Sequence, residues 1–138
     1  MYKIFLVFLF SAALFGSELE WMHNYKEAQK LALKENKAVL LLITTEGCRW
    51  CRKLESTTLR DDDVIANISA DFIPVHLTRG KDSYPSTLKA KRVPASFFLY
   101  SDGRPIMRSV MGYWSAEDYL SILEDAKRKI RKTGDSKQ

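Results

Sequence analysis

Two cysteines, Cys48 and Cys51, are the only cysteines of this 138-residue chain, and they closely follow the apolar run at residues 38–43. A short apolar run bounded by polar residues is typical of a buried strand. If a helix begins after Gly47, Cys48 lies at its N-terminus, where free backbone N–H groups and the helix dipole favour a thiolate. The motif therefore predicts a strand followed by a helix that carries a reactive dithiol.

A C-x-x-C motif also serves as a structural disulfide, a metal site or a haem attachment site, and the sequence disfavours each of these uses. A disulfide between residues 48 and 51 closes a very short loop and constrains little of the unfolded chain. Haem attachment needs a histidine directly after the second cysteine, where this chain has Arg52. Zinc usually needs four ligands, and only His23 and His76 remain to complete a set. Redox chemistry is the favoured interpretation, and we expect no bound metal and no cofactor.

A mostly apolar segment at residues 4–15 follows a single lysine near the N-terminus. It is too short to span a bilayer comfortably, and this arrangement is typical of a secretory signal peptide. The cleavage site is imperfect, because Leu14 and Gly16 flank the expected cut, so a short membrane anchor is the alternative. We expect residues 1–16 to be the signal or anchor and residues 17–138 to form one domain in the oxidising periplasm, or otherwise outside the cytoplasm.

Basic residues outnumber acidic ones by 22 to 17, which gives a formal net charge of +5. The excess is spread along the chain, with one concentration at residues 127–132. Basic side chains near the C-terminal end of a helix interact favourably with the helix dipole, which explains this concentration without a nucleic-acid partner. A chain of this length that is 46% hydrophobic builds one sizeable core. We therefore expect a single domain that binds no nucleic acid.

Hydrophobic periodicity and capping residues predict an alternation of helices and strands in the first two thirds of the chain. Asn24, with Glu27 three residues later, is typical of a helix N-terminus. Pro74 lies within a strand-like run and places that strand at an edge or a bulge. The predicted elements are a helix from Asn24 to Glu35, a strand at 38–43, a helix at 48–59, a short helix capped by residues 61–63, a strand at 72–77, a loop at 79–84 and a short helix at 86–92.

The C-terminal part of the chain combines a hairpin pattern with a final helix. Two strand-like runs at 95–100 and 105–111 flank residues 101–104, whose Asp-Gly pair is a strong hairpin signal. The two strands are therefore predicted to be antiparallel neighbours. Ser115, with Asp118 three residues later, forms a capping box for the last helix.

These features together resemble the thioredoxin fold, an α/β fold in which a mixed β-sheet is flanked by helices. The resemblance rests on the order of the elements, on the C-x-x-C motif at the start of the helix after the first strand, and on Val93-Pro94 just before the third strand. It covers about residues 20–131. In detail the chain is similar to exported thioredoxin-like proteins with a C-x-W-C-[KR] centre, here residues 48–52.

The resemblance implies a role for each residue around the motif. Cys48 is expected to be the attacking thiolate that forms a mixed disulfide with a partner protein, and Cys51 is expected to resolve it. Pro94 resembles the cis-proline that faces the dithiol, and the Val93 backbone is expected to pair with an extended substrate. Trp50 either contacts substrate polypeptides or covers the loop, and the sequence leaves these two alternatives open.

Two departures from the thioredoxins concern the redox properties. Leu42 lies six residues before Cys48, at the position where thioredoxins have a buried carboxylate. Arg49 is expected to stabilise the Cys48 thiolate and to make the disulfide more oxidising. Glu46, on the preceding loop, acts in the opposite direction or is merely solvated. The direction of the net shift stays open at this point.

We therefore expect an exported thiol–disulfide oxidoreductase that acts as a reductase on protein disulfides. Its partners are expected to be protein thiols and disulfides and a membrane thiol reductase as electron donor, and the protein is expected to be a monomer. The alternatives are a disulfide oxidase or isomerase, and a non-catalytic thioredoxin-like module whose dithiol holds a metal or a partner. The soft ligands available to such a metal module are Met22, Met107 and Met111, which fit packing positions better.

Overall fold

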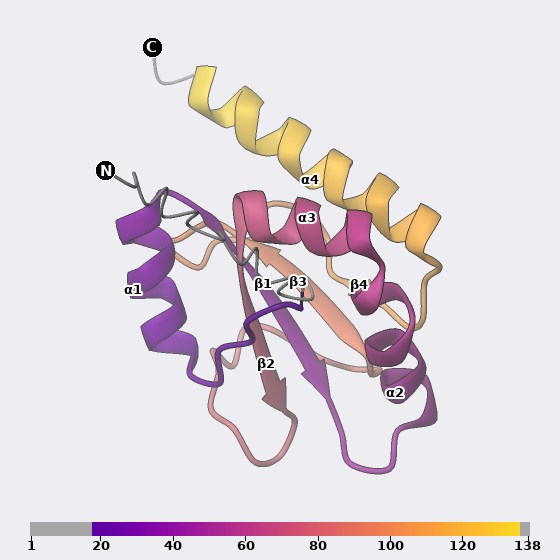
Figure 1. Cartoon of the computed structure of the whole chain (residues 1–138). Helices are drawn as coiled ribbons and strands as arrows, with labels where there is room; N and C mark the ends of the chain where they lie inside the picture. The colour runs from indigo at the N-terminus through magenta and orange to yellow at the C-terminus, as the bar shows by residue number, and fades with distance from the viewer. Residues whose placement is uncertain (1–17, 136–138) are drawn as a thin grey trace, which may run out of the picture.

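A four-stranded mixed sheet with the strand order β2-β1-β3-β4 forms the centre of the protein and has helices on both faces (Figure 1). The computed structural model describes residues 18–135. The expected signal or anchor at residues 1–16 lies outside the described residues. Within residues 18–135, no helix combines the length and the apolar character needed to cross a bilayer. The arrangement confirms the predicted α/β class and the mixed sheet.

Helix caps follow the sequence signals closely. The side chain of Asn24 accepts a hydrogen bond from the Glu27 N–H at 3.1 Å, and Asp61 accepts from the Asp63 and Val64 N–H groups. These bonds satisfy backbone donors that have no partner within a first helical turn. The elements are α1 (Tyr25–Glu35), β1 (Ala38–Thr44), α2 (Arg49–Ser56), the 3-10 helix η1 (Thr58–Arg60), α3 (Asp62–Asp71), β2 (Phe72–Thr78), β3 (Ala95–Leu99), β4 (Val110–Met111) and α4 (Ala116–Asp135).

The central strand β1 pairs in parallel with β2 and antiparallel with β3. All seven residues of β1 are buried, as expected for a strand that is covered on both faces. β2 is an edge strand, as Pro74 predicted, and its outer side pairs with Met22. The Met22 N–H donates to the Pro74 carbonyl, and the His76 N–H donates to the Met22 carbonyl. The missing N–H of Pro74 is on this outer side, so β2 loses no hydrogen bond to β1.

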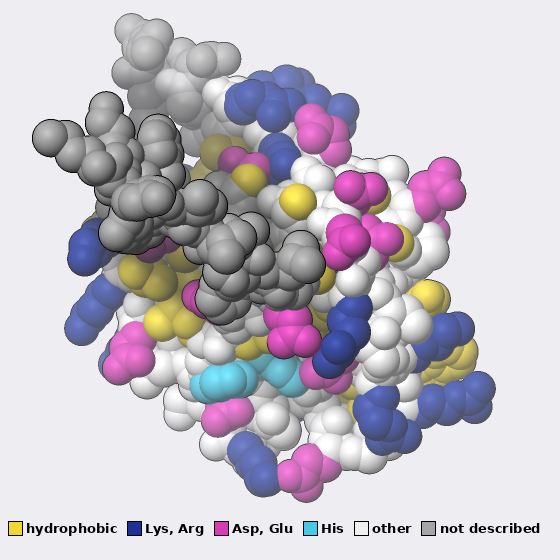
Figure 2. Space-filling view, viewed as in Figure 1, with side chains coloured by type: hydrophobic (Ala, Val, Ile, Leu, Met, Phe, Trp, Pro, Cys, Tyr) yellow, Lys and Arg dark blue, Asp and Glu magenta, His cyan; other side chains and the backbone are white. Residues whose placement is uncertain are grey.

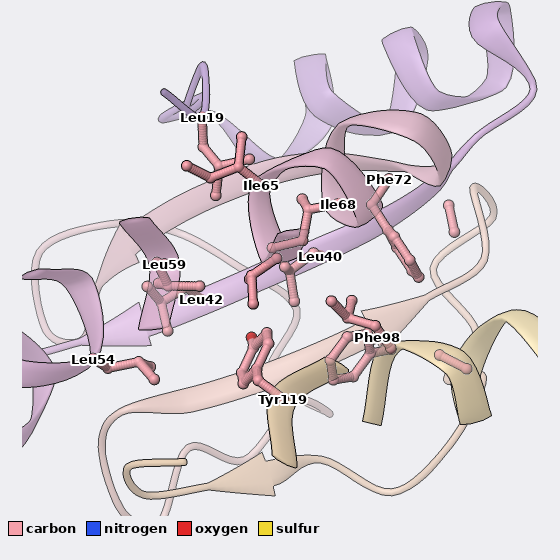
Figure 3. Close-up of a cluster of buried hydrophobic side chains, with 14 of the residues drawn as sticks. Leu19, Leu40, Leu42, Leu54, Leu59, Ile65, Ile68, Phe72, Phe98 and Tyr119 are labelled. Carbon is pink, nitrogen blue, oxygen red and sulfur yellow. The ribbon is translucent and has the colours of Figure 1, made fainter. Parts of the chain in front are cut away.

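Alternating side chains of the sheet form two hydrophobic layers. Leu40 and Leu42 of β1 point toward α2, α3 and α4, whereas Val39 and Leu41 point toward α1. Figure 3 shows the first layer, in which Phe98 of β3 lies between Phe72 and Tyr119. The phenol of Tyr119 is completely buried and donates to the Ser96 hydroxyl at 2.9 Å. The helices α2, α3 and α4 therefore pack on one continuous hydrophobic layer of the sheet.

Two helix predictions need correction. The helix expected at 48–59 ends at Ser56, and η1 continues the chain. The helix expected at 86–92 is absent, and that segment contains turns without a helix. Its Ala90 carbonyl accepts a hydrogen bond at 2.6 Å from the guanidinium of Arg79, which lies just after β2. Leu88 and Ala90 are buried against the layer on the α1 side, so tertiary contacts hold this segment in an irregular path.

The hairpin forms, but its second strand is shorter than predicted. The Ile106 N–H donates to the Phe98 carbonyl, and β3 pairs antiparallel with β4. Of the predicted strand 105–111, only a bridge at Pro105 and the strand Val110–Met111 are paired with β3, and the residues between them leave the sheet. Ile106 and Met107 both pack against the layer on the α3 and α4 side. A regular strand would place adjacent side chains on opposite faces, which explains the break.

Candidate redox site

The two cysteines lie where β1 leads into α2, as predicted. Cys48 is the N-cap residue of α2 and forms a disulfide with Cys51, with 5.3 Å between their Cα atoms. Gly47 makes the preceding turn with φ of 69°, a left-handed conformation that favours glycine. The Cys51 N–H donates to the sulfur of Cys48 at 3.2 Å. Once the bond is reduced, this N–H and the helix end favour a thiolate on Cys48.

The two sulfur-bearing residues differ in their access to solvent. Cys48 is half-buried, whereas Cys51 is only 2% exposed and lies against the core side of α2. An external thiol or disulfide can therefore approach Cys48 but not Cys51. This asymmetry is the one required of an attacking residue and a resolving residue.

The Val93–Pro94 peptide bond precedes β3 and is cis, as the resemblance implied. Pro94 is buried, and its carbonyl accepts a hydrogen bond at 2.8 Å from the Gly112 N–H, which fixes the segment to the loop after β4. Val93 is half-buried.

A groove of about 430 Å³ lies beside this segment and includes part of α2. Trp50 lies on its α2 side with its ring centroid 6.1 Å from that of Tyr113. Trp50 keeps 46% of its surface exposed, so it packs on Tyr113 and also offers an apolar surface to solvent. We call this feature the Trp50–Tyr113 groove, and it is lined by Trp50, Arg92, Val93, Met111, Gly112 and Tyr113.

Two cations flank the aromatic pair of this groove. The Arg49 guanidinium lies 5.1 Å from the centroid of the Trp50 ring. The Lys53 ammonium lies 5.2 Å from Trp50 and 4.4 Å from Tyr113, within the range of cation–π attraction. Helical spacing explains the placement of Lys53, because residues three apart on a helix share a face. The rim next to Cys48 is therefore aromatic and positively charged.

Glu46 lies on the exposed loop before the motif and forms an ion pair with Lys81. The hydrogen bond and the positive charge of Lys81 lower the pKa of the Glu46 carboxyl. Because Lys81 neutralises the Glu46 carboxylate, Glu46 counteracts the effect of the Arg49 charge on the Cys48 thiolate only weakly. The placement matches the interpretation of Glu46 as a solvated loop residue.

Leu42 occupies the strand position where thioredoxins have a buried carboxylate. Its side chain is 1% exposed and belongs to the hydrophobic layer. The neighbouring strand places His76 opposite Leu42. The His76 imidazole shares a 2.8 Å hydrogen bond with the Thr44 hydroxyl and lies 3.5 Å from the Glu55 carboxylate. Burial lowers the pKa of His76 more than Glu55 raises it. His76 is therefore neutral at pH 7. Its neighbour Glu55 lies on α2, one helical turn after Cys51.

Three residues of this site were not expected there from the sequence. Tyr113 and Lys53 lie on the rim beside Trp50, and Arg92 lines the groove. Met111, considered from the sequence only as a soft metal ligand, also lines the groove. The i+3 spacing from Trp50 is a signal that would have found Lys53, whereas no local signal links Tyr113 to α2.

Metal binding gains no support from the arrangement. Within residues 18–135, no group of three or more His, Cys, Asp or Glu side chains is placed to hold a metal ion. The methionines considered as soft ligands do not converge. Met107 packs against one hydrophobic layer, and Met22 and Met111 pack against the other.

Comparisons with known proteins agree with the fold and the motif. A thioredoxin-like domain family matches residues 25–127. Spermatogenesis-associated protein 20 of Homo sapiens is 30% identical over 61 residues, which are 44% of this chain and 8% of that protein. Anterior gradient protein 3 of Mus musculus is 23% identical over 84 residues, which are 61% of this chain and 51% of that protein. The chain thus spans about half or less of the length of these curated relatives.

Solved structures show the same fold. A thioredoxin from Thermus thermophilus superposes with a TM-score of 0.64 at 21% identity, covering 78% of this chain and 85% of that one. The oxidised C-terminal domain of DsbD from Neisseria meningitidis gives a TM-score of 0.59 at 23% identity, covering 73% of this chain and 91% of that one. Because the family match covers most of the chain and includes the C-x-x-C motif, this protein belongs to the thioredoxin-like domain family.

Proposed function

We propose that the protein is a thiol–disulfide oxidoreductase that reduces protein disulfides outside the cytoplasm. The observation that carries the proposal is the contrast between the two cysteines. Cys48 is accessible at the start of α2 and accepts the Cys51 N–H, whereas Cys51 is only 2% exposed. A dithiol built for structure alone would not need one accessible sulfur at a site that favours its thiolate.

The proposed reaction is two successive exchanges. The Cys48 thiolate attacks one sulfur of a substrate disulfide, the substrate S–S bond breaks, and one substrate thiolate leaves with the electron pair. Cys51 then loses its proton and attacks the Cys48 sulfur, which releases the second substrate thiolate and forms the Cys48–Cys51 disulfide. The enzyme loses two electrons and the Cys51 proton, and the two substrate thiolates take up two protons, one of them from solvent. An external dithiol restores the reduced enzyme by the reverse exchanges.

We propose the reducing direction because the chain resembles the thioredoxins, and we propose a location outside the cytoplasm. Export is supported by the apolar segment at residues 4–15, with a membrane anchor by the same segment as the alternative. Outside the cytoplasm a membrane-embedded thiol reductase is the dithiol donor that we propose. We propose that Trp50, Val93 and Pro94 hold the substrate segment next to Cys48.

Reduction of insulin by dithiothreitol tests this function. Wild-type protein is expected to accelerate the precipitation of the insulin B chain, because it offers a faster exchange route than dithiothreitol itself. Cys48→Ala is expected to return the rate to that of dithiothreitol alone. Cys51→Ser that is reduced and then freed of dithiothreitol is expected to accumulate a mixed disulfide with insulin, visible on a non-reducing gel. Equal rates for wild type and Cys48→Ala would contradict the enzymatic function and favour a binding module.

A disulfide oxidase is the second candidate, and one observation favours it. Arg49 lies beside Cys48 in the sequence, and Lys53 lies on the same rim. Cations near the thiolate stabilise the reduced form and make the disulfide more oxidising. The reduction potential decides between the two directions.

A further inference from the structure

The rim of the Trp50–Tyr113 groove carries positive charge that the protein does not neutralise. Arg49, Lys53 and Arg92 are exposed, and within residues 18–135 none of them has a carboxylate partner. Figure 2 shows Lys and Arg side chains beside hydrophobic ones at the lower right, over α2. By contrast, four closely spaced basic residues of α4 are each near a carboxylate, namely Lys127, Arg128, Lys129 and Arg131.

The floor between these charges is apolar and suits an extended peptide. Trp50, Val93 and Met111 line the groove, and Arg92 lies at the same groove one residue before the cis bond. Lys53 follows Cys48 by five residues, which is about 7.5 Å along a helix axis. Two residues of an extended segment span about 6.6 Å. A side chain about two residues from the attacked cysteine therefore reaches the cations.

We infer that this groove selects disulfides whose flanking segment carries Asp or Glu within about two residues of the attacked cysteine. The inference rests on the proposed function and specifies its substrate class. Carboxylates of the substrate segment would form ion pairs with Arg49, Lys53 and Arg92, and the apolar floor would contact the adjacent side chains. The Trp50 and Tyr113 rings cover one side of the Arg49 and Lys53 cations, so ion pairs made there are less screened than pairs in open solvent. An uncharged segment would leave the cations without partners.

Two disulfide peptides of matched sequence test the selectivity. One carries Glu at two positions flanking each cysteine, and the other carries Gln at the same positions. The ratio of kcat/KM for the two peptides is the readout, because the same Cys48 thiolate attacks both and its reactivity cancels. Each exposed ion pair is expected to contribute about twofold, so three cations predict a ratio of about eight at low salt. The ratio is expected to fall below about two in 0.5 M NaCl, where screening is strong.

Variants assign the effect to the groove. The double variant Lys53→Gln/Arg92→Gln is expected to lower the ratio to about two. The control Lys30→Gln/Lys34→Gln removes the same net charge from the exposed side of α1, on the other face of the sheet, and is expected to keep the ratio near eight. A wild-type ratio near one, or an unchanged ratio in the groove variant, would overturn the inference. An equal loss in both double variants would also overturn it, because net charge would then explain the preference.

A binding measurement separates this inference from the proposed function. Both peptides are titrated into Cys48→Ala, which cannot exchange, and Trp fluorescence or calorimetry gives the two dissociation constants. Binding of the Glu peptide about eightfold more tightly supports the inference even if neither peptide is turned over, a result that would contradict only the enzymatic function. Equal dissociation constants would refute the inference even if both peptides are reduced.

Discussion

Alkylation of the reduced protein is expected to separate the two cysteines sharply. Cys48 gains about 1.5 kcal/mol for its thiolate from the Cys51 N–H, because hydrogen bonds to charged groups are worth about 1.5–3 kcal/mol. The end of α2 adds about 0.5 kcal/mol. Together these contributions of about 2 kcal/mol correspond to a factor of about thirty in the thiolate population below neutral pH. Cys51, at 2% exposure, must also wait for a local opening.

The chain itself makes the assay simple. Arg49 and Arg52 follow Cys48 and Cys51 directly, so trypsin separates the two cysteines into different peptides. Reduced protein is treated with iodoacetamide at pH 6, quenched at intervals and digested, and mass spectrometry gives the two rates. Cys48 is expected to react at least about thirtyfold faster. Lys53→Gln is expected to slow Cys48 by about twofold, since an exposed charge contributes little. Equal rates, or faster reaction of Cys51, would refute the assignment of the two roles.

Three further predictions concern the surroundings of the motif. Phe98→Ala is expected to lower the free energy of unfolding by about 3–5 kcal/mol in urea titrations, because Phe98 is fully buried between Phe72 and Tyr119; a loss below 1 kcal/mol would contradict this packing. Burial lowers the folded-state pKa of His76. The contribution of His76 to the free energy of unfolding is therefore fully present above the unfolded-state pKa of about 6.5 and is lost as the pH falls from there through the folded-state pKa. His76→Gln is expected to flatten this dependence, and an unchanged slope between pH 7 and pH 5 would show that His76 does not cause it. Trp50→Ala is expected to raise KM for insulin several-fold with little change in the Cys48 alkylation rate, whereas an unchanged KM would assign Trp50 to packing.

Local signals in the sequence predicted most of the frame around the site. The β1 run, Gly47 and the cap position of Cys48 lie within ten residues of one another, and each has a conformational preference that agrees with its neighbours. The edge position of β2 followed from one residue, since Pro74 lacks an N–H to donate.

Tertiary contacts, which no local pattern contains, account for the errors. The predicted helix at 86–92 has helical composition, yet the Arg79 guanidinium binds its Ala90 carbonyl and the layer on the α1 side buries Leu88. The Trp50–Tyr113 pair joins residues that only the fold brings together, so neither residue predicts the other. The positive rim depends on the same pairing. Local pattern therefore predicted the reactive motif, and tertiary contacts decided which side chains surround it.

The reduction potential of the Cys48–Cys51 pair tests the proposed reductase most directly. Thioredoxin lies at about −270 mV, and 30 mV corresponds to about 1.4 kcal/mol for a two-electron couple. Arg49 and Lys53 on the exposed rim stabilise the thiolate by at most about 1 kcal/mol each. Equilibration with glutathione buffers is therefore expected to give about −270 to −225 mV. A value near −120 mV would contradict the reductase and assign the protein as an oxidase.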